Sequence, residues 1–242
     1  MGSDCRALDD VDAVLLDLGG VFYLPDHARV TRALAAFDVV IPADQLDRAH
    51  YEGVAALRHH APAGHHADGS TIWHAYNRAY ATACGVAEPD VVDAAAALLA
   101  EFGRGDVWTR PIPGARAALA ELAARGFSLA VVSNADGTVE QQLRVDAVCQ
   151  VGPGAGVEVS AIVDSTVVGV AKPDPAIFRL ALDALGVPAG RAIHVGDTPS
   201  ADIAGAQAAG MRPVLVDPYD LHPDVGCPRV ASLAGLLELL SA

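Results

Sequence analysis

Short apolar runs recur along the two ends of the chain and predict buried strands. Helical patterns lie between them: Ala115–Arg125 follows Pro113-Gly114 and ends before Gly126, and an alanine-rich segment spans 201–210. The runs are Ala13–Leu16, Phe127–Val132, Ala192–Val195 and Pro213–Val216. Apolar character without alternation is typical of strands covered on both faces. Strands that alternate with helices predict an α/β fold with a parallel sheet.

The pattern changes between about Pro25 and Pro111, where the strand-like runs give way to helix formers. Helices are predicted over 30–37, 43–57, 70–83 and 90–102. Trp73, Tyr76 and Tyr80 lie at helical spacing and are expected in a core. We therefore predict two domains, one formed by 1–24 and 112–242 and a helical insert formed by 25–111.

Composition limits the classes of partner. The chain has 242 residues, of which 52% are apolar, and 30 acidic against 16 basic residues give a net charge of −14. That charge repels nucleic-acid backbones and anionic lipid surfaces, so neither is expected as a partner. A small anionic substrate would need local compensation by a metal ion, a lysine or backbone amides.

The cysteines and the N-terminal segment indicate the compartment. Cys5, Cys84, Cys149 and Cys227 show no CxxC spacing, so neither a zinc knuckle nor a disulfide framework is indicated. Residues 1–12 carry four aspartates and no apolar stretch, and no later run is long enough to span a membrane. We expect a cytoplasmic protein with reduced thiols.

Chemically competent side chains follow three of the predicted strands. Asp17, Ser133 and Asp197 come at or just after the runs, and the carboxyl ends of parallel strands meet in one crevice. A carboxylate there can attack phosphorus to form an acyl phosphate. Mg²⁺ would screen the repulsion between carboxylate and phosphate, and hard oxygen ligands such as Asp17 and Asp197 suit it.

A lysine and two glycines complete the pattern. Lys172 precedes Pro173-Asp174-Pro175, where Asp174 can cap the next helix, so its ammonium would be held near the crevice. Gly19 and Gly20 allow the backbone to approach a phosphate closely. Taken singly, each element is more often an ordinary cap, turn or surface residue. The four elements together, in this order, favour an active site.

In this order, the elements resemble the four motifs of the haloacid dehalogenase-like hydrolase superfamily. They are Asp17-Leu18-Gly19-Gly20, Ser133-Asn134, Lys172-Pro173 and Gly196-Asp197, and the resemblance spans about residues 12 to 217. It implies a Rossmann-like parallel sheet with helices on both faces, and a helical cap domain of the first type inserted after the first strand. Most members of this superfamily are magnesium-dependent phosphatases.

The resemblance also implies a role for each residue. Asp17 would be the nucleophile and a metal ligand, Asp197 the second carboxylate ligand, and Gly19 a ligand through its carbonyl. Lys172 would hold nucleophile and substrate, and Gly20, Ser133 and Asn134 would bind the phosphoryl group. Asp202 would support the lysine or a metal-bound water.

The sequence departs from the family pattern at Gly19, where an aspartate usually serves as general acid and base. Its loss should cost about 10²–10⁴-fold in rate if nothing replaces it. Three explanations stay open: a substrate with a good leaving group, such as an anomeric or acyl phosphate; a replacement from Tyr23, Asp26, His27 or a cap histidine; or binding without turnover.

Histidines are concentrated in the insert, which holds seven of the nine, with His59-His60 and His65-His66 near Arg58. No HxxxH spacing supports a zinc site. We interpret the segment 59–66 first as a solvated loop. The second interpretation is that Arg58 and these histidines contact the substrate and contribute to specificity. His194, on a predicted buried strand, is expected to be structural.

The sequence thus favours a magnesium-dependent phosphatase that acts on a small phosphorylated metabolite, as a monomer or homodimer. One alternative is a 2-haloacid dehalogenase, which also lacks an acid at the Gly19 position. That branch typically has Ser-Ser-Asn in the fourth motif, where this chain has Gly196-Asp197. Another is a catalytically weak protein that binds a phosphorylated ligand or a protein partner.

Overall fold

The structure, a computed structural model, describes residues 8, 10–57, 69–105 and 107–240. Cys5, Arg58 and the histidines from His59 to His66 lie outside the described residues. The chain divides into two compact units, which we call the sheet unit (Met1–Phe22, Ile112–Pro218 and Asp224–Ala242) and the helical unit (Tyr23–Pro111 and Tyr219–Pro223). The segment Tyr219–Pro223 belongs to the helical unit, although more than 100 residues separate it in sequence from the rest of that unit.

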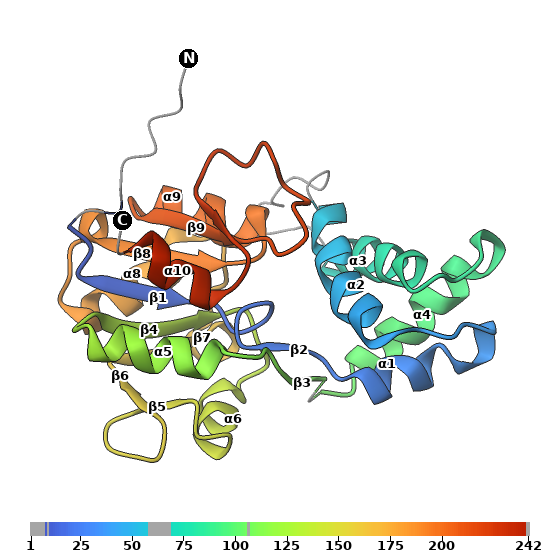
Figure 1. The fold of residues 1–242 in the computed structure, drawn as a ribbon, viewed down its shortest axis with the longest axis horizontal. Coiled ribbons are helices and arrows are strands. Elements are labelled where there is room, and N and C mark those ends of the chain that lie inside the picture. The colour runs from blue at the N-terminus through green and yellow to red at the C-terminus, as the bar shows by residue number, and fades with distance from the viewer. Residues whose placement is uncertain (1–7, 9, 58–68, 106, 241–242) are drawn as a thin grey trace. The chain divides into compact units, whose positions relative to one another are not determined.

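The sheet unit is built on a central parallel sheet of six strands (Figure 1). Its strands are β1 (Ala13–Leu16), β4 (Ser128–Ser133), β7 (Ala161–Asp164), β8 (Ala192–Gly196), β9 (Arg212–Val216) and β10 (Arg229–Val230). They follow the order β10-β9-β8-β1-β4-β7, and every pairing is parallel. The predicted α/β fold with a parallel sheet is therefore confirmed, and β1 lies in its interior.

Helices cover both faces of this sheet (Figure 1). They are α5 (Ala115–Ala124), α6 (Val139–Val145), α7 (Ser165–Val168), α8 (Pro175–Leu185), α9 (Ala204–Ala208) and α10 (Leu233–Leu239). Leu15 and Val132 share a core cluster with Phe178 of α8 and Ala206 of α9. Figure 1 draws α5 and α10, which contact each other, in front of the sheet, and α8 behind it. Burial on both faces explains why the strands read as unbroken apolar runs.

The described residues of the helical unit form four α-helices and a short strand pair. The helices are α1 (His27–Ala33), α2 (Ala43–Ala56), α3 (Gly69–Ala83) and α4 (Val91–Phe102), with 3-10 turns at Ala35–Phe37 and Glu88–Asp90. The strands β2 (Tyr23–Pro25) and β3 (Trp108–Pro111) pair antiparallel at the two ends of the insert. Tyr76 and Tyr80 are fully buried in its core, as expected, whereas Trp73 is 43% exposed, so the expectation for Trp73 was wrong.

The sequence pattern missed the shortest strands. Besides β2, β3, β7 and β10, these are β5 (Cys149–Val151) and β6 (Val157–Val159), which form a parallel pair of their own. Runs of two or three residues give too few positions for a pattern to be recognised, and β2 and β3 both contain proline. The strands that the pattern predicted, β1, β4, β8 and β9, are predominantly apolar runs, and the first three of them position the candidate site.

Two global properties bear on the expected compartment. Among the described helices, none combines the length and apolarity needed to cross a bilayer. Cys84, Cys149 and Cys227 are free thiols. Burial raises the pKa of Cys84 and of Cys149 to about 12, and that of Cys227 to about 11.

These thiols should resist alkylation in the folded protein. Only the thiolate reacts, so a raised pKa removes most of the reactive form, and the rate should rise about tenfold for each pH unit between pH 7 and 9. In a Cys5→Ser variant treated with iodoacetamide, mass spectrometry should show labelling at least about 10²-fold slower than in urea-unfolded protein. Equal rates in the folded and unfolded protein would contradict this prediction.

Candidate active site

Three predicted residues meet where the central strands end. β1 pairs with β4 and β8 in register, so that Leu16 lies opposite Val131 and Val195. Asp17 follows at once, and its backbone N–H donates to the carbonyl of Val195 at 2.9 Å. The side chains of Asp17, Ser133 and Asp197 all leave this one edge of the sheet, and all three residues are buried.

Lys172 joins two of the carboxylates. Its Nζ donates to Asp17 Oδ1 at 2.8 Å and to Asp202 Oδ1 at 2.7 Å. The lysine side chain is 1% exposed, and that of Asp202 is fully buried. A buried ammonium with two carboxylate partners is fixed in position, as the sequence analysis expected for the lysine.

Asp202 is itself held from two sides. Its Oδ1 also contacts His194 Nε2 at 2.8 Å, and its Oδ2 accepts from the backbone N–H of Thr198 at 2.9 Å. A Cβ on Gly196 would overlap the Asp202 carboxylate, so only glycine lets β8 pass this close. His194 therefore does more than pack in the core, because its contact with Asp202 helps to orient the carboxylate that holds Lys172.

Asn134 positions the lysine through its backbone. Its side-chain oxygen accepts from Lys172 N–H at 2.8 Å, and its Nδ2 donates to the Lys172 carbonyl at 3.0 Å. Asp174 caps α8 by accepting from Ala176 N–H at 2.9 Å, as predicted. The chain on either side of Lys172 is thus anchored. Sequence reasoning did not foresee the two bonds from Asn134, since no local signal connects residues 38 apart.

The loop that follows Ser133 is pinned by the neighbouring strand. Ser133 lies opposite Asp164 of β7, and Asp164 Oδ2 accepts from Gly137 N–H at 2.9 Å. The hydroxyl of Thr166 donates to the Ala135 carbonyl at 2.6 Å. These contacts fix the backbone beyond Ser133 and Asn134, which is the segment expected to bind a phosphoryl group.

The carboxylates fit a hard divalent cation. Ligand atoms of Asp17, Asp197 and Asp202 lie within 4.8 Å of one another. Both oxygens of Asp202 already accept hydrogen bonds from protein groups, so Asp17 and Asp197 are the better ligand pair. Gly20 has φ +67°, and a Cβ there would overlap the Asp197 carboxylate. The donor set and the close glycine both agree with an oxygen-ligated magnesium ion.

The charges also favour a cation. Burial is the largest cause that raises the pKa of Asp17, Lys172 lowers this pKa, and the carboxylates of Asp202 and Asp197 raise it, with a net pKa of about 7. Burial lowers the pKa of Lys172, but Asp17 and Asp202 raise it by more, so the ammonium is retained. Burial likewise opposes ionisation of Asp202, yet Lys172 and His194 hold its pKa below the ordinary value. One ammonium thus pairs with two of three neighbouring buried carboxylates, and a divalent ion would add compensating positive charge.

A family model for haloacid dehalogenase-like hydrolases matches residues 11–210, which include every residue of the candidate site described above. The chain belongs to this family. It is 41% identical to the phosphoserine phosphatase of Thermus thermophilus over 105 residues, which are 43% of this chain and 40% of that protein. It is 42% identical to the phosphoglycolate phosphatase of Rhodospirillum rubrum over 125 residues, which are 51% of this chain and 46% of that protein. The chain thus spans less than half of the length of these two relatives.

The fold of this haloacid dehalogenase-like hydrolase is also found in solved structures. The magnesium-bound form of the putative HAD hydrolase YfnB from Bacillus subtilis matches it with a TM-score of 0.58. The two chains are 20% identical, and the match covers 97% of this chain and all of the other. At this identity the likeness concerns the fold alone.

The side chains considered as replacements at Gly19 already have structural contacts. Asp26 caps α1 by accepting from Arg29 N–H at 2.8 Å. His27 Nε2 lies 2.7 Å from Asp47 Oδ1, and Arg110 contacts the same oxygen at 2.6 Å. Tyr23 is buried on β2. Asp26 and His27 thus have contacts within the helical unit of the hydrolase.

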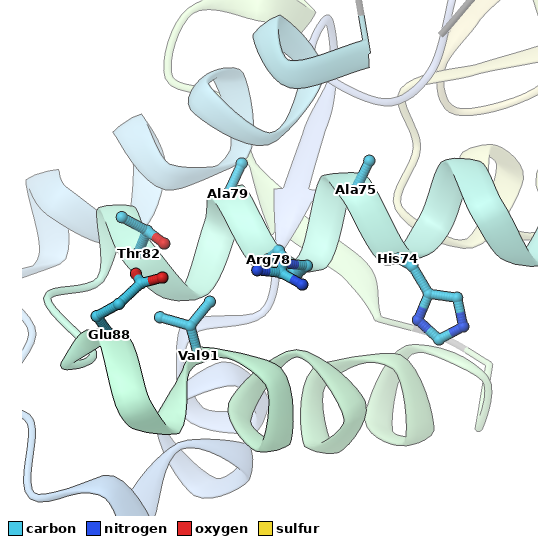
Figure 2. Close-up of a pocket in the computed structure, with 7 residues that line it drawn as sticks. All are labelled: His74, Ala75, Arg78, Ala79, Thr82, Glu88 and Val91. Atoms are coloured by element: carbon cyan, nitrogen blue, oxygen red, sulfur yellow. The ribbon is translucent and has the colours of Figure 1, made fainter. Parts of the chain in front are cut away.

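A cavity in the helical unit was not foreseen from the sequence. It measures about 510 Å³ and lies between α3 and α4 (Figure 2). Its lining residues are His74, Ala75, Arg78, Ala79, Thr82, Glu88 and Val91. His74, Arg78 and Thr82 recur every four residues along α3, a polar stripe that the sequence shows in retrospect. None of the predicted site residues lines this cavity.

Removal of the Asp17 charge should stabilise the metal-free hydrolase. Its pKa of about 7 lies above the value in an unfolded chain, so the folded state binds the extra proton between about pH 4 and 7. Stability from this group is therefore lost as the pH rises through 7. Urea unfolding of Asp17→Asn in EDTA should give a free energy of unfolding about 1–3 kcal/mol above wild type at pH 8 and a smaller difference at pH 4.5. An Asp17→Asn protein less stable than wild type at pH 8 would contradict this.

A side chain at Gly20 should damage the site more than backbone strain alone. Gly20 and Gly186 both have φ +67°, but a Cβ on Gly186 meets nothing within 4 Å. Gly186→Ala therefore measures the backbone cost, and Gly20→Ala adds the overlap with Asp197. We expect Gly20→Ala to lose about 1–3 kcal/mol more in urea unfolding. Equal losses would show that the Asp197 carboxylate moves aside freely.

Proposed function

We propose that this family member is a magnesium-dependent phosphatase that hydrolyses a small phosphorylated metabolite through an aspartyl phosphate on Asp17. The observation that carries the proposal is the buried Asp17 carboxylate, which lies beside Asp197 and accepts from Lys172 at 2.8 Å. The similarity to two proteins named as phosphatases supports the same reaction class.

In this proposal Asp17 and Asp197 hold the metal, with the Gly19 carbonyl as a further ligand. Bound Mg²⁺ would supply positive charge that screens the phosphate from the nucleophile. Asp17 attacks phosphorus through one carboxylate oxygen, and the resulting acyl phosphate is cleaved by water. Gly20, the Ser133 hydroxyl and the Asn134 N–H bind the phosphoryl oxygens, where rigid donors stabilise developing charge.

Lys172 has two tasks in the proposal. Its ammonium orients Asp17 and offsets negative charge on the phosphoryl group. Asp202, which accepts from Lys172 at 2.7 Å and contacts His194, keeps that ammonium in place and takes no direct part in bond making. The helical unit would serve as the cap that excludes water while the first step occurs.

Partners and compartment follow from the same features. A small phosphorylated metabolite is the only ligand class in the proposal, and the net charge of −14 argues against nucleic acid and anionic membranes. The free thiols Cys84, Cys149 and Cys227 agree with a reducing cytoplasm. A monomer or a homodimer would serve the reaction equally, because every proposed site residue comes from one chain.

The test is phosphate release from a panel of phosphorylated metabolites and an aryl phosphate, in Mg²⁺ or in EDTA. We expect release in Mg²⁺ only, and a loss of at least about 10³-fold in Asp17→Asn, since the nucleophile is removed. Asp12→Asn, a surface change, is the matched control and should retain activity. Metal-independent halide release from a 2-haloacid would instead identify a dehalogenase, and binding of phosphate without any turnover would identify a ligand-binding protein.

A further inference from the structure

The carboxylates around Asp17 are paired with protein donors. Lys172 donates to Asp17 and Asp202, at 2.8 and 2.7 Å. Both oxygens of Asp202 act as acceptors. The Thr198 hydroxyl donates to Asp197 at 3.0 Å. Among the described residues of the sheet unit that contact this cluster, no carboxyl group is therefore placed to act as an acid toward a departing group.

The backbone beyond the nucleophile adds no acid either. Leu18 is apolar and buried, and Gly19 has no side chain. An alkyl phosphate ester releases an alkoxide, which needs a proton in the transition state. Among the described residues of the sheet unit, no carboxyl or imidazole group beside Asp17 is free of a protein partner to give that proton.

We infer that the Asp17 site acts on phosphoryl compounds whose leaving group departs as a stable anion, namely acyl phosphates and phosphates of acidic enols or phenols. This rests on the proposed function and narrows its substrate class. It makes simple alkyl phosphates poor substrates.

The steps balance without a proton donor. Asp17 Oδ attacks phosphorus, the bond from phosphorus to the leaving oxygen breaks, and its electron pair stays on the carboxylate or enolate that leaves. Water then attacks phosphorus, the bond to Asp17 breaks with its electron pair left on the Asp17 carboxylate, and both protons of the water end on the released phosphate. An acyl phosphate dianion and water thus give a carboxylate and dihydrogen phosphate, which exchanges protons with solvent, and the Asp17 carboxylate is restored.

The experiment measures kcat/KM in Mg²⁺ for para-substituted phenyl phosphates of similar size, with acetyl phosphate and glycerol phosphate at the two extremes. We expect kcat/KM to fall by about tenfold for every one to two units of leaving-group pKa, because charge accumulates on an unprotonated oxygen. A flat dependence, with good turnover of glycerol phosphate, would overturn the inference.

Position 19 gives a matched pair of variants. Gly19 has no positive φ, so its backbone conformation is open to other residues. Gly19→Asp adds an acid, and should raise the ratio of kcat/KM on glycerol phosphate to kcat/KM on acetyl phosphate by about 10²–10⁴-fold. Gly19→Asn adds nearly the same volume without an acid and should leave the steep dependence in place. Equal effects of the two variants would count against a missing proton.

Failure of the inference and failure of the proposed function are distinguishable. If Asp17→Asn does not lower release from any compound in the series, the proposed function is wrong. If release depends on Asp17 but not on the leaving group, the proposed function stands and only the inference falls. The wild-type series decides this even if neither variant at position 19 folds.

Discussion

The candidate site depends on one buried ammonium between two carboxylates. Lys172 is almost fully enclosed, and a buried charge is tolerated only where partners satisfy it. Asp202 provides the permanent partner, since His194 and the Thr198 N–H hold it from behind. Asp17 provides the second partner, but it is the less firmly held of the two. The carboxylate that is hardest to keep ionised is thus the one that the proposed mechanism requires to be ionised.

This arrangement connects strand order to reactivity. β1 lies between β4 and β8, so Asp17 leaves the sheet between the strands that carry Ser133 and Asp197. Lys172 lies two residues before the N-terminal cap of α8, a helix that packs in the next layer. Two hydrogen bonds from the Asn134 side chain join the Lys172 backbone to the end of β4. Asp17, Ser133 and Asp197 lie at or directly after the ends of paired strands. Lys172 lies in the loop before α8, and the hydrogen bonds from Asn134 anchor that loop.

The sequence was enough for the apolar strands and for the residues at their ends. Ala13–Leu16 was predicted with its observed bounds, because an apolar run of four residues between Asp12 and Asp17 is long enough for a strand and too short for a buried helix. The contact between His194 and Asp202 could not be predicted from the sequence pattern. It depends on a π-helical turn at Pro199–Ile203, which brings Asp202 back toward β8. The strand pair at the ends of the insert was also not predicted. Its two strands pair residues more than 80 positions apart, and each strand contains a proline. Contacts between distant segments are fixed by tertiary packing, which no local pattern encodes.

That strand pair has a consequence for how the chain is organised. The chain leaves the sheet unit at Phe22 and returns at Ile112, and the Ile112 N–H donates to the Phe22 carbonyl at 2.8 Å. β2 and β3 continue this pairing into the helical unit. To the sheet unit, the whole insertion is therefore equivalent to a hairpin turn, whose ends are already closed. An insert joined in this way can lengthen, shorten or be exchanged over evolutionary time while the strands that carry the aspartates keep their register.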